Sequence, residues 1–363
     1  MTERTTLADL TTMRVGGAPT AVHRPESVTE LVEAVRTAWR EAEEGPESVL
    51  VLGGGSNVVA PDAGVPGPVV LTGGVRGIES VAADDGLVHL RVAAGEPWDG
   101  VVAATIERGL GTLAALSGIP GSAGAAPVQN IGAYGAEIAE SLVSVDFLDG
   151  VSGRIERVAA ADLGLGYRTS AMKQGRRGVV LAVELALPPS DRATVRYGQL
   201  AAALGVASGA TVPASQVREA VLRIRGEKGM LIGPGMPDSC GSFFMNPVVD
   251  ENWARSLPPE APRYPVGPLE APVAAPLEAG PVLRGFADAR SVKLAAAWLI
   301  EAAGIPKGYA IPGSRAQLSP RHALSITNAG GATAAEVLQL AGFIQARVSA
   351  DFGVNLQPEP ILL

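Results

Sequence analysis

The sequence predicts a mixed α and β protein that folds into two or three domains. The chain has 363 residues, whereas single hydrophobic cores rarely grow past roughly 250 residues. Hydrophobic residues make up 47% of the chain and charged residues 18%, which excludes bulk disorder. Stretches with helical periodicity alternate with short apolar stretches that are typical of strands. With 45 Gly, 28 Pro and only 4% aromatic residues, the chain has many tight turns and backbone that a ligand can approach closely.

The N-terminal half begins with a predicted helix and continues mainly with predicted strands. Ser27 and Glu30 have the spacing of a capping box, and apolar residues then repeat on one face, so we expect a helix over 27–44. Short apolar or alternating stretches predict strands at 49–52, 69–71, within 78–94 and at 179–187.

The C-terminal half contains two predicted helices and a proline-rich segment. We expect helices over 291–303, ended by Gly304, and over 334–348, where apolar residues share a face. Eight prolines fall between Leu257 and Pro281, which predicts an extended loop or excursion outside the core. The sequence shows no internal repeat.

Charge and composition argue against several classes of protein. The net charge of −8 and the lack of a Lys/Arg cluster argue against sequence-independent binding of nucleic acid. A single cysteine cannot form an internal disulfide, which fits a reducing compartment. The N-terminus has no signal-peptide pattern, and no segment approaches the roughly 20 apolar residues of a membrane span. These features predict a cytoplasmic protein. The three histidines and Cys240 have no metal-ligand spacing, so we expect no metal site.

A glycine-rich segment, Gly53-Gly54-Gly55-Ser56-Asn57, directly follows a predicted buried strand. Successive glycine N–H groups can form a concave surface of donors for an anion. The segment is not a dinucleotide fingerprint, because Val58 stands where the third glycine belongs, and no Gly-Lys-Ser/Thr follows as in a P-loop. A plain glycine-rich turn is the alternative.

The second candidate segment is Ser117–Gly135, which carries no charged residue although it has the composition of a loop. Its many small residues would let the backbone lie flush against a flat ring or a pyrophosphate. A buried connection between two domains is the alternative.

Three further segments carry polar groups suited to chemistry. Around Ser242, the pair Phe243 and Phe244 can bury and fix the backbone so that neighbouring polar groups face a ligand. Arg168 offers a planar array of donors for carboxylate or enolate oxygens. Glu359 lies between two prolines that stiffen the chain. The alternatives are a serine in a turn, an arginine on the surface and a glutamate in a solvated tail.

Taken in order, these segments resemble the UDP-N-acetylenolpyruvoylglucosamine reductase family over nearly the whole chain. Arg196-Tyr197-Gly198 belongs to the same motif set, and only the proline-rich segment 257–281 is not explained by it. The resemblance implies an α+β fold in which a two-domain FAD-binding unit of the vanillyl-alcohol-oxidase (PCMH) type precedes an α+β substrate-binding domain. The domains expected are 1–75 with 350–363 and 76–225 for FAD, and 226–349 for the substrate.

The resemblance also implies the reaction and its cofactors. NADPH would reduce FAD, and the reduced flavin would pass hydride to C3 of UDP-N-acetylglucosamine enolpyruvate to give UDP-N-acetylmuramate, a peptidoglycan precursor. The protein would act as a monomer in the cytoplasm. The residues implied to hold FAD are Gly53, Gly54, Gly55, Ser56, Asn57, Ser117, Gly118, Gly121, Gly124, Ala125, Asn130, Ile131, Gly132 and Arg225.

The resemblance further assigns catalytic and substrate-binding roles. Arg168 would stabilise the negative charge of an enolate, Glu359 would assist Arg168, and Ser242 would donate a proton to C2. The residues implied to bind the substrate are Tyr197, Lys228, Asn246 and His322. The chain departs from the family at three positions. Some members carry Lys where this chain has Met245, some carry Gln in place of His322, and Glu is common in place of Gln357. The segment after Lys228 also lacks the usual Leu-Pro-Asp.

Two other functions use the same features. A flavin oxidase on the same scaffold would pass electrons to oxygen, but Ser242 and Glu359 would then have no evident role. A nucleotide-binding protein without catalysis is the second. Acyl transfer is disfavoured, because no nearby motif supplies Ser242 with a base.

Overall fold

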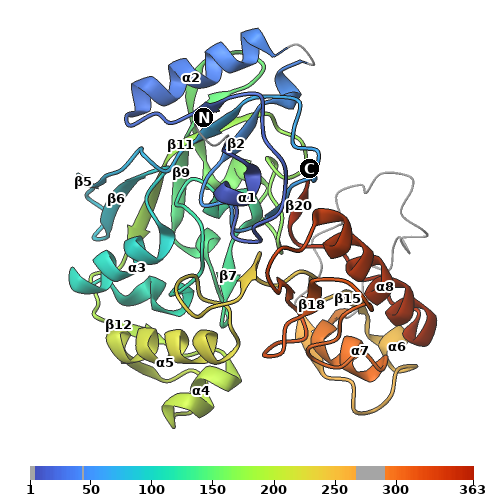
Figure 1. The fold of residues 1–363 in the computed structure, drawn as a ribbon. Helices are drawn as coiled ribbons and strands as arrows, with labels where there is room; N and C mark the ends of the chain where they lie inside the picture. Colours follow the sequence, from blue (N-terminus) through green and yellow to red (C-terminus); the bar gives the residue numbers. More distant parts are fainter. Residues whose placement is uncertain (1–4, 43–44, 267–290) are drawn as a thin grey trace. The chain divides into compact units, whose positions relative to one another are not determined.

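The computed structural model describes residues 5–42, 45–266 and 291–363, which belong to two compact units (Figure 1). The first unit runs to Gly241 and includes Ile361–Leu363, and the second comprises Ser242–Pro360. Both units mix helices and strands, as the sequence predicts. The finer division of the chain into 1–75 with 350–363, 76–225 and 226–349 stays a prediction.

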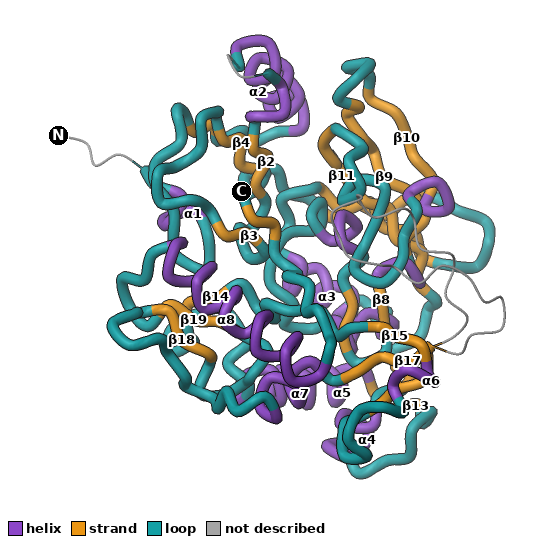
Figure 2. The backbone as a smooth tube through the Cα atoms, turned by 90° about the vertical axis from the view of Figure 1, so that its right-hand side faces the viewer, coloured by secondary structure: helices purple, strands orange, loops and turns teal. Residues whose placement is uncertain are grey.

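The first unit is built on two sheets. The three-stranded parallel sheet has the order β1-β4-β2, and the five-stranded antiparallel sheet has the order β10-β9-β11-β6-β5; β9, β10 and β11 lie side by side in Figure 2. Their strands are β1 (Val22–His23), β2 (Leu50–Leu52), β4 (Val69–Leu71), β5 (Ile78–Val81), β6 (Val88–Ala93), β9 (Leu142–Asp149), β10 (Ile155–Ala159) and β11 (Gly178–Leu187). The predicted strands at 49–52, 69–71, 78–94 and 179–187 are confirmed.

Helix α2 (Val28–Glu41) joins the two sheets of this unit, as Figure 1 shows beside β2 and β11. Leu31 and Val35 are fully buried and pack with Val70 of the small sheet and Leu181 of the large one. The Ser27 side chain caps the helix by accepting from the Glu30 N–H at 3.2 Å. The Glu30 carboxylate accepts from the Glu26 N–H, and not from the Ser27 N–H as a full capping box would require.

The central strand β11 is buried on both faces, which explains its nearly continuous apolar sequence. Val179 and Leu181 face the α2 side, whereas Val183 and Leu185 face the main core with Trp98. The register with β9 shifts between Val180 and Ala182. Such a bulge offsets the two-residue alternation, so that Val179 and Leu181 lie on one face and Val183 and Leu185 on the other.

The remaining elements of the first unit cover the main core and extend it. Helices α4 and α5 pack together through Leu200, Val217, Val221 and Ile224. The elements are α1 (Leu7–Leu10), β3 (Val58–Val59), α3 (Trp98–Glu107), β7 (Gly132–Ala133), β8 (Ala136–Glu137), β12 (Arg192–Thr194), α4 (Gly198–Leu204), β13 (Thr211–Pro213), α5 (Ala214–Glu227), β14 (Asp238–Ser239) and β20 (Ile361–Leu362). Strand β20 pairs in parallel with β3, which ties the C-terminus to the first unit.

The second unit contains two small antiparallel pairings and a long helix. Strands β15 and β16 both pair with β17, and β18 pairs with β19. The elements are β15 (Val248–Asp250), α6 (Glu251–Ala254), β16 (Arg263–Val266), β17 (Ser291–Leu294), α7 (Ala296–Ala302), β18 (Ala316–Leu318), β19 (Ile326–Asn328) and α8 (Ala334–Phe352). Helix α8 confirms the prediction for 334–348, begins with a capping box at Thr333 and ends at the left-handed Gly353. No helix of the described residues is long and apolar enough to cross a membrane.

Two predictions for the second unit are wrong in part. The stretch 291–303 is not one helix, because Ser291–Leu294 forms β17 between two partner strands and only Ala296–Ala302 is helical. The proline-rich segment is not wholly outside the folded structure, because Arg263–Val266 forms edge strand β16 and Leu257 and Ala261 are buried. Prolines are tolerated on an edge strand, since one side of it makes no ladder bonds. The rest of that prediction, 267–281, lies outside the described residues.

A row of charged side chains crosses the five-stranded sheet and centres on His89. Its Nδ1 lies 2.9 Å from Glu184 Oε1 and its Nε2 lies 2.9 Å from Asp85 Oδ2. The Arg157 guanidinium also donates to Glu184. The hydrogen bond to Glu184, followed by that to Asp85, raises the pKa of His89 above its ordinary value of 6.5.

We expect this cluster to make stability depend on pH. Because the pKa of His89 is higher in the folded state, the stabilisation is complete below about pH 6.5 and is lost as the pH rises through the folded-state value. Within that window the free energy of unfolding falls by at most about 1.4 kcal/mol per pH unit from this group. Urea unfolding followed from pH 5 to 9 measures it, with His89→Gln as the comparison. Parallel curves for the two proteins would contradict the prediction.

Candidate cofactor and active site

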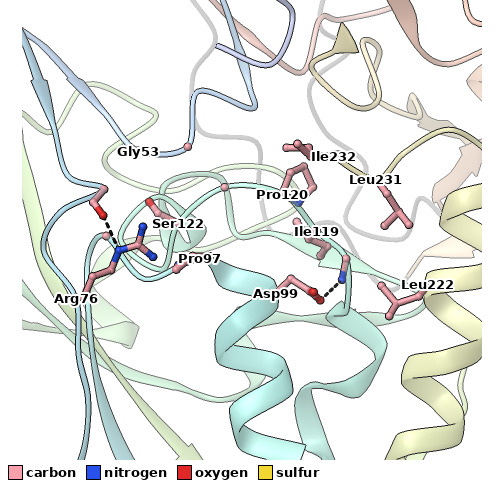
Figure 3. Close-up of a pocket in the computed structure, with 15 residues that line it drawn as sticks. Gly53, Arg76, Pro97, Asp99, Ile119, Pro120, Ser122, Leu222, Leu231 and Ile232 are labelled. Atoms are coloured by element: carbon pink, nitrogen blue, oxygen red, sulfur yellow. Dashed lines mark hydrogen bonds between the residues drawn. The ribbon is translucent and has the colours of Figure 1, made fainter. Parts of the chain in front are cut away.

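The first unit contains two neighbouring cavities of about 420 and 370 Å³, which share Gly53 and Ser122. The first cavity lies between the glycine-rich loop after β2, the uncharged loop at 118–122 and residues of α5 and the chain after it (Figure 3). The second lies between α2, β2, β11 and the residues just after Ser122. The structure therefore brings together the two segments that the sequence singles out for a cofactor.

The two loops approach each other so closely that side chains are excluded. A Cβ on Gly53 would lie 2.4 Å from Ser122 Oγ, and a Cβ on Gly54 would lie 2.9 Å from Gly121 Cα. Gly121 itself has φ +109°, which L side chains rarely adopt. The glycines are thus required by the close packing of backbone around the cavities.

Two buried hydroxyl groups beside the cavities have no hydrogen-bond partner among the described residues. In the described part of the chain, Ser122 Oγ and Thr72 Oγ1 are buried and make no hydrogen bond. Because an unsatisfied buried hydroxyl costs free energy, these donors fit a site whose ligand supplies the acceptors.

Only part of the predicted cofactor set lines the cavities. Gly53, Gly54, Gly118 and Gly121 line the first cavity, and Gly53, Gly124 and Ala125 line the second. The other residues support the loops.

Three of those supporting residues have defined contacts. Asn57 Nδ2 donates to Gln129 Oε1 at 2.6 Å and so ties the two loops together. Ser117 is buried, and its hydroxyl donates to the Ala114 carbonyl. The backbone of Gly55 lies against Leu10, and a Cβ there would come within 2.1 Å of the Leu10 carbonyl oxygen.

Arg225 lies behind the first cavity and is 6% exposed. Its Nε donates to the Gly118 carbonyl at 3.0 Å and its Nη2 to the Met230 carbonyl at 3.0 Å. Burial lowers the pKa of Arg225, while Tyr134 and Asp99 counteract it. An arginine stays protonated in proteins, so the first cavity has a fixed positive charge beside it.

Arg168 occupies a strained turn next to the uncharged loop. The turn is closed by backbone hydrogen bonds between Gly166 and Thr169, and Arg168 has φ +54°. Its Nη2 donates to the Gly132 carbonyl at 2.5 Å and its Nη1 to the Asn130 carbonyl at 3.4 Å. Asn130 Nδ2 in turn donates to the Gly166 carbonyl at 3.0 Å, so the loop and the turn hold each other.

Strained backbone concentrates around this turn. Of the four described residues other than glycine with positive φ, three are Asn130, Tyr134 and Arg168. Each such conformation costs on the order of 1–3 kcal/mol and persists only where the surrounding structure enforces it, most often at functional sites. Ser170, just after Arg168, adds a further tie by donating to the Val128 carbonyl at 2.6 Å.

Two predicted substrate residues lie at the α4–α5 end of the first unit. Tyr197 is 40% exposed, and its ring packs edge-on against that of Tyr134, with the ring centroids 5.8 Å apart. Lys228 Nζ donates to Gln199 Oε1 at 2.8 Å. Burial, together with the charge of Arg225, lowers the pKa of Lys228.

Ser242 and Glu359 lie on adjacent backbone segments of the second unit. The Glu359 N–H donates to the Phe243 carbonyl at 2.9 Å, and the Met245 N–H donates to the Gln357 carbonyl at 2.9 Å. Phe243 and Phe244 are 0% and 1% exposed, with ring centroids 5.2 Å apart. The phenylalanine pair is therefore buried, as the sequence predicts, and its backbone pairs with the segment that carries Glu359.

Other predicted residues of the second unit have structural contacts of their own. Asn246 Oδ1 accepts from the Ala296 N–H at 3.0 Å and so caps the start of α7. The His322 carbonyl accepts from the Ser325 N–H in a turn. Cys240, just before this segment, is buried and forms no disulfide among the described residues.

Sequence reasoning missed several residues that line the cavities. Ser122 and Thr72 carry the unsatisfied hydroxyls, Asp99 and Arg76 line the first cavity, and Arg176 lines the second. The adjacent arginines at 176 and 177, directly before a predicted strand, were a usable signal. Asp99 had none, because it differs in no local pattern from other residues in the first turn of a helix.

Two family profiles match the chain in the order of its units. The FAD binding domain matches residues 19–159, which contain both glycine-bearing loops of the cavities. The C-terminal domain of UDP-N-acetylenolpyruvoylglucosamine reductase matches residues 234–363. The UDP-N-acetylenolpyruvoylglucosamine reductase of Leifsonia xyli subsp. xyli is 50% identical over 382 aligned residues, covering 100% of this chain and 99% of that protein. The chain belongs to the UDP-N-acetylenolpyruvoylglucosamine reductase family.

Further relatives agree with this membership. The UDP-N-acetylenolpyruvoylglucosamine reductase of Saccharopolyspora erythraea is 45% identical, with 98% of this chain and 94% of that protein covered. The crystal structure of the Thermus caldophilus reductase superposes with a TM-score of 0.62 at 25% identity, covering 99% of this chain and 98% of that chain. The predicted resemblance and the α+β fold with an FAD-binding domain are thus confirmed. The chain is an FAD-binding oxidoreductase of this reductase family.

Proposed function

We propose that this protein reduces UDP-N-acetylglucosamine enolpyruvate to UDP-N-acetylmuramate with NADPH as the electron donor. The relatives that match it over its full length carry the name of that reductase. The observation that carries the proposal is the pair of cavities beside two flush glycine loops, both of which lie in the segment matched by the FAD binding domain. The product is a precursor of peptidoglycan, and we place the reaction in the cytoplasm with the protein acting as a monomer.

The residues around the cavities fit FAD. The backbone of Gly53, Gly54, Gly118 and Gly121 offers a surface without side chains, on which a ring or a pyrophosphate can lie. The unsatisfied hydroxyls of Ser122 and Thr72 add hydrogen-bond donors. When bound and reduced, FAD supplies the hydride for the enolpyruvyl double bond.

Arg168 stabilises the negative charge that develops when the double bond takes up hydride. Its guanidinium is fixed by the carbonyls of Asn130 and Gly132, so it needs no reorganisation during the reaction. A planar guanidinium also matches the two oxygens of a carboxylate or enolate. The strained αL conformation at Arg168 fits a residue whose orientation matters more than its backbone energy.

Ser242 donates the proton that completes the reduction at C2. A serine hydroxyl is a weak acid, so its neighbours must hold it in place and replace the proton it gives up. The buried pair Phe243 and Phe244 fixes the backbone of the segment. Glu359, hydrogen-bonded through its backbone to Phe243, assists the polarisation of the enolpyruvyl group. Tyr197, Lys228, Asn246 and His322 bind the sugar nucleotide.

The purified protein tests the proposal directly. We expect a yellow protein with a flavin absorption spectrum, which oxidises NADPH only when UDP-N-acetylglucosamine enolpyruvate is added. NADH in parallel assays measures the preference for the phosphorylated donor. A colourless protein that cannot be reconstituted with FAD would rule the proposal out. Rapid oxygen consumption with an alcohol substrate would instead indicate a flavin oxidase.

A further inference from the structure

We propose that Asp99 and Arg218 are positioning residues for the cofactor, because they fix the Gly118 backbone in the wall of the first cavity. The inference rests on the proposed binding of FAD there. Asp99 lies in the first turn of α3 and Arg218 on α5, so the pair joins two helices to one loop. Neither residue belongs to the predicted FAD-binding set.

The Asp99 carboxylate holds the N–H side of Gly118. Its Oδ1 accepts from the Gly118 N–H at 2.6 Å, as the dashed line in Figure 3 shows. Arg218 Nη1 donates to the same oxygen at 2.5 Å, and Nη2 donates to Oδ2 at 2.8 Å. A two-pronged contact of this kind fixes the plane of the carboxylate as well as its position.

The opposite side of Gly118 is held by Arg225. The Arg225 Nε donates to the Gly118 carbonyl at 3.0 Å. Gly118 has φ +69°, and a Cβ there would lie 2.7 Å from Leu231 Cδ2 and 2.9 Å from Leu222 Cδ2. Both backbone polar groups of Gly118 are therefore paired with charged side chains, in space that admits no side chain of its own.

The surroundings of the pair favour a role in binding over a role in folding. The side chain of Asp99 is 39% exposed and that of Arg218 is 21% exposed, and Asp99 lines the cavity. Partly exposed ion pairs contribute little to folding stability. A loop that is already fixed in its bound conformation, however, loses less entropy when the ligand binds. The main effect of the pair should therefore appear in FAD affinity.

The test measures FAD release from the holoprotein, by flavin fluorescence on dilution, for four variants. We expect Asp99→Ala to raise the Kd for FAD about 10-fold, the size of one to two lost hydrogen bonds. Arg218→Ala should raise the Kd less than Asp99→Ala does. Asp99→Asn should give a Kd between those of the parent protein and Asp99→Ala, because the amide oxygen of Asn still accepts from the Gly118 N–H. The control Arg223→Ala removes an exposed charge of the same helix and should leave the Kd unchanged.

Melting curves separate positioning from folding. If the pair acts through FAD affinity, FAD-free Asp99→Ala and FAD-free parent protein melt at the same temperature, and at equal saturating FAD the variant melts below the parent. An unchanged Kd in Asp99→Ala, or an FAD-free variant that already melts well below the FAD-free parent, would overturn the inference, as would a parent protein that binds no FAD. A parent protein that binds FAD but does not reduce the enolpyruvyl sugar nucleotide overturns only the proposed reaction.

Discussion

Replacing Ser242 with alanine should lower turnover by about 10²–10⁴-fold and leave the FAD content unchanged, because a general acid contributes on that scale. The proposed role of the hydroxyl is confined to proton delivery, which follows the arrival of hydride on the substrate. The variant keeps the buried Phe243 and Phe244, so the backbone of the segment should stay in place.

Single-turnover kinetics separate the two half-reactions of Ser242→Ala. Reduction of the flavin by NADPH should proceed at the parent rate, and reoxidation by the enolpyruvyl sugar nucleotide should be slow. Ser256→Ala is the matched control, since Ser256 is an exposed serine of the same unit whose hydroxyl donates to the Trp253 carbonyl. An equal slowing of both half-reactions would remove Ser242 from the role of proton donor.

The parts of the site that the sequence predicts well are those that depend on local backbone. Glycines after a buried strand and an uncharged loop can be recognised without knowing which segment packs against them. A close approach of two backbones excludes side chains wherever in the sequence the second segment lies. The structure bears this out at Gly53 and Gly121, where the two loops pack against each other. The burial of the phenylalanine pair was also predictable from local sequence, since a Phe-Phe dipeptide beside small residues has few other roles.

The parts that the sequence does not predict depend on contacts between distant segments. Asp99 meets Gly118 and Arg218 only after three elements have packed, and nothing in its own neighbourhood signals that. The segment Ser291–Leu294 has apolar spacing that suits a helix or a strand, and its pairing with β15 and β16 decides between them. The bulge in β11 likewise arises from pairing with β9.

The left-handed conformations near Arg168 also depend on contacts between distant segments. Asn tolerates φ above zero, but Tyr134 and Arg168 adopt it only because hydrogen bonds and packing from other segments hold them. No sequence pattern marks such a residue. In this chain Asn130 and Tyr134 nonetheless lie in the loop that holds Arg168, the residue of the first unit that the family resemblance assigns to catalysis, which is where stored strain is expected.

Arg168→Lys should lower turnover by about 10²–10³-fold although it keeps the positive charge, because that is the scale on which one well-placed donor to a developing negative charge contributes. The guanidinium reaches the Gly132 carbonyl through Nη2 and the Asn130 carbonyl through Nη1, and one ammonium nitrogen cannot reproduce both contacts in a single plane. Lysine and arginine carry the same backbone penalty at φ +54°, so strain does not explain the expected loss.

Turnover with saturating NADPH and sugar nucleotide measures the effect of Arg168→Lys, with the flavin spectrum as a check on cofactor content. Arg192→Lys is the matched control, because Arg192 is exposed on β12 of the same unit and its guanidinium donates to the Thr211 carbonyl. Undiminished turnover in Arg168→Lys would mean that charge alone suffices at this position. The proposed role of the fixed planar guanidinium would then be wrong, whereas a large loss confined to Arg168 would tie the strained turn to the chemistry.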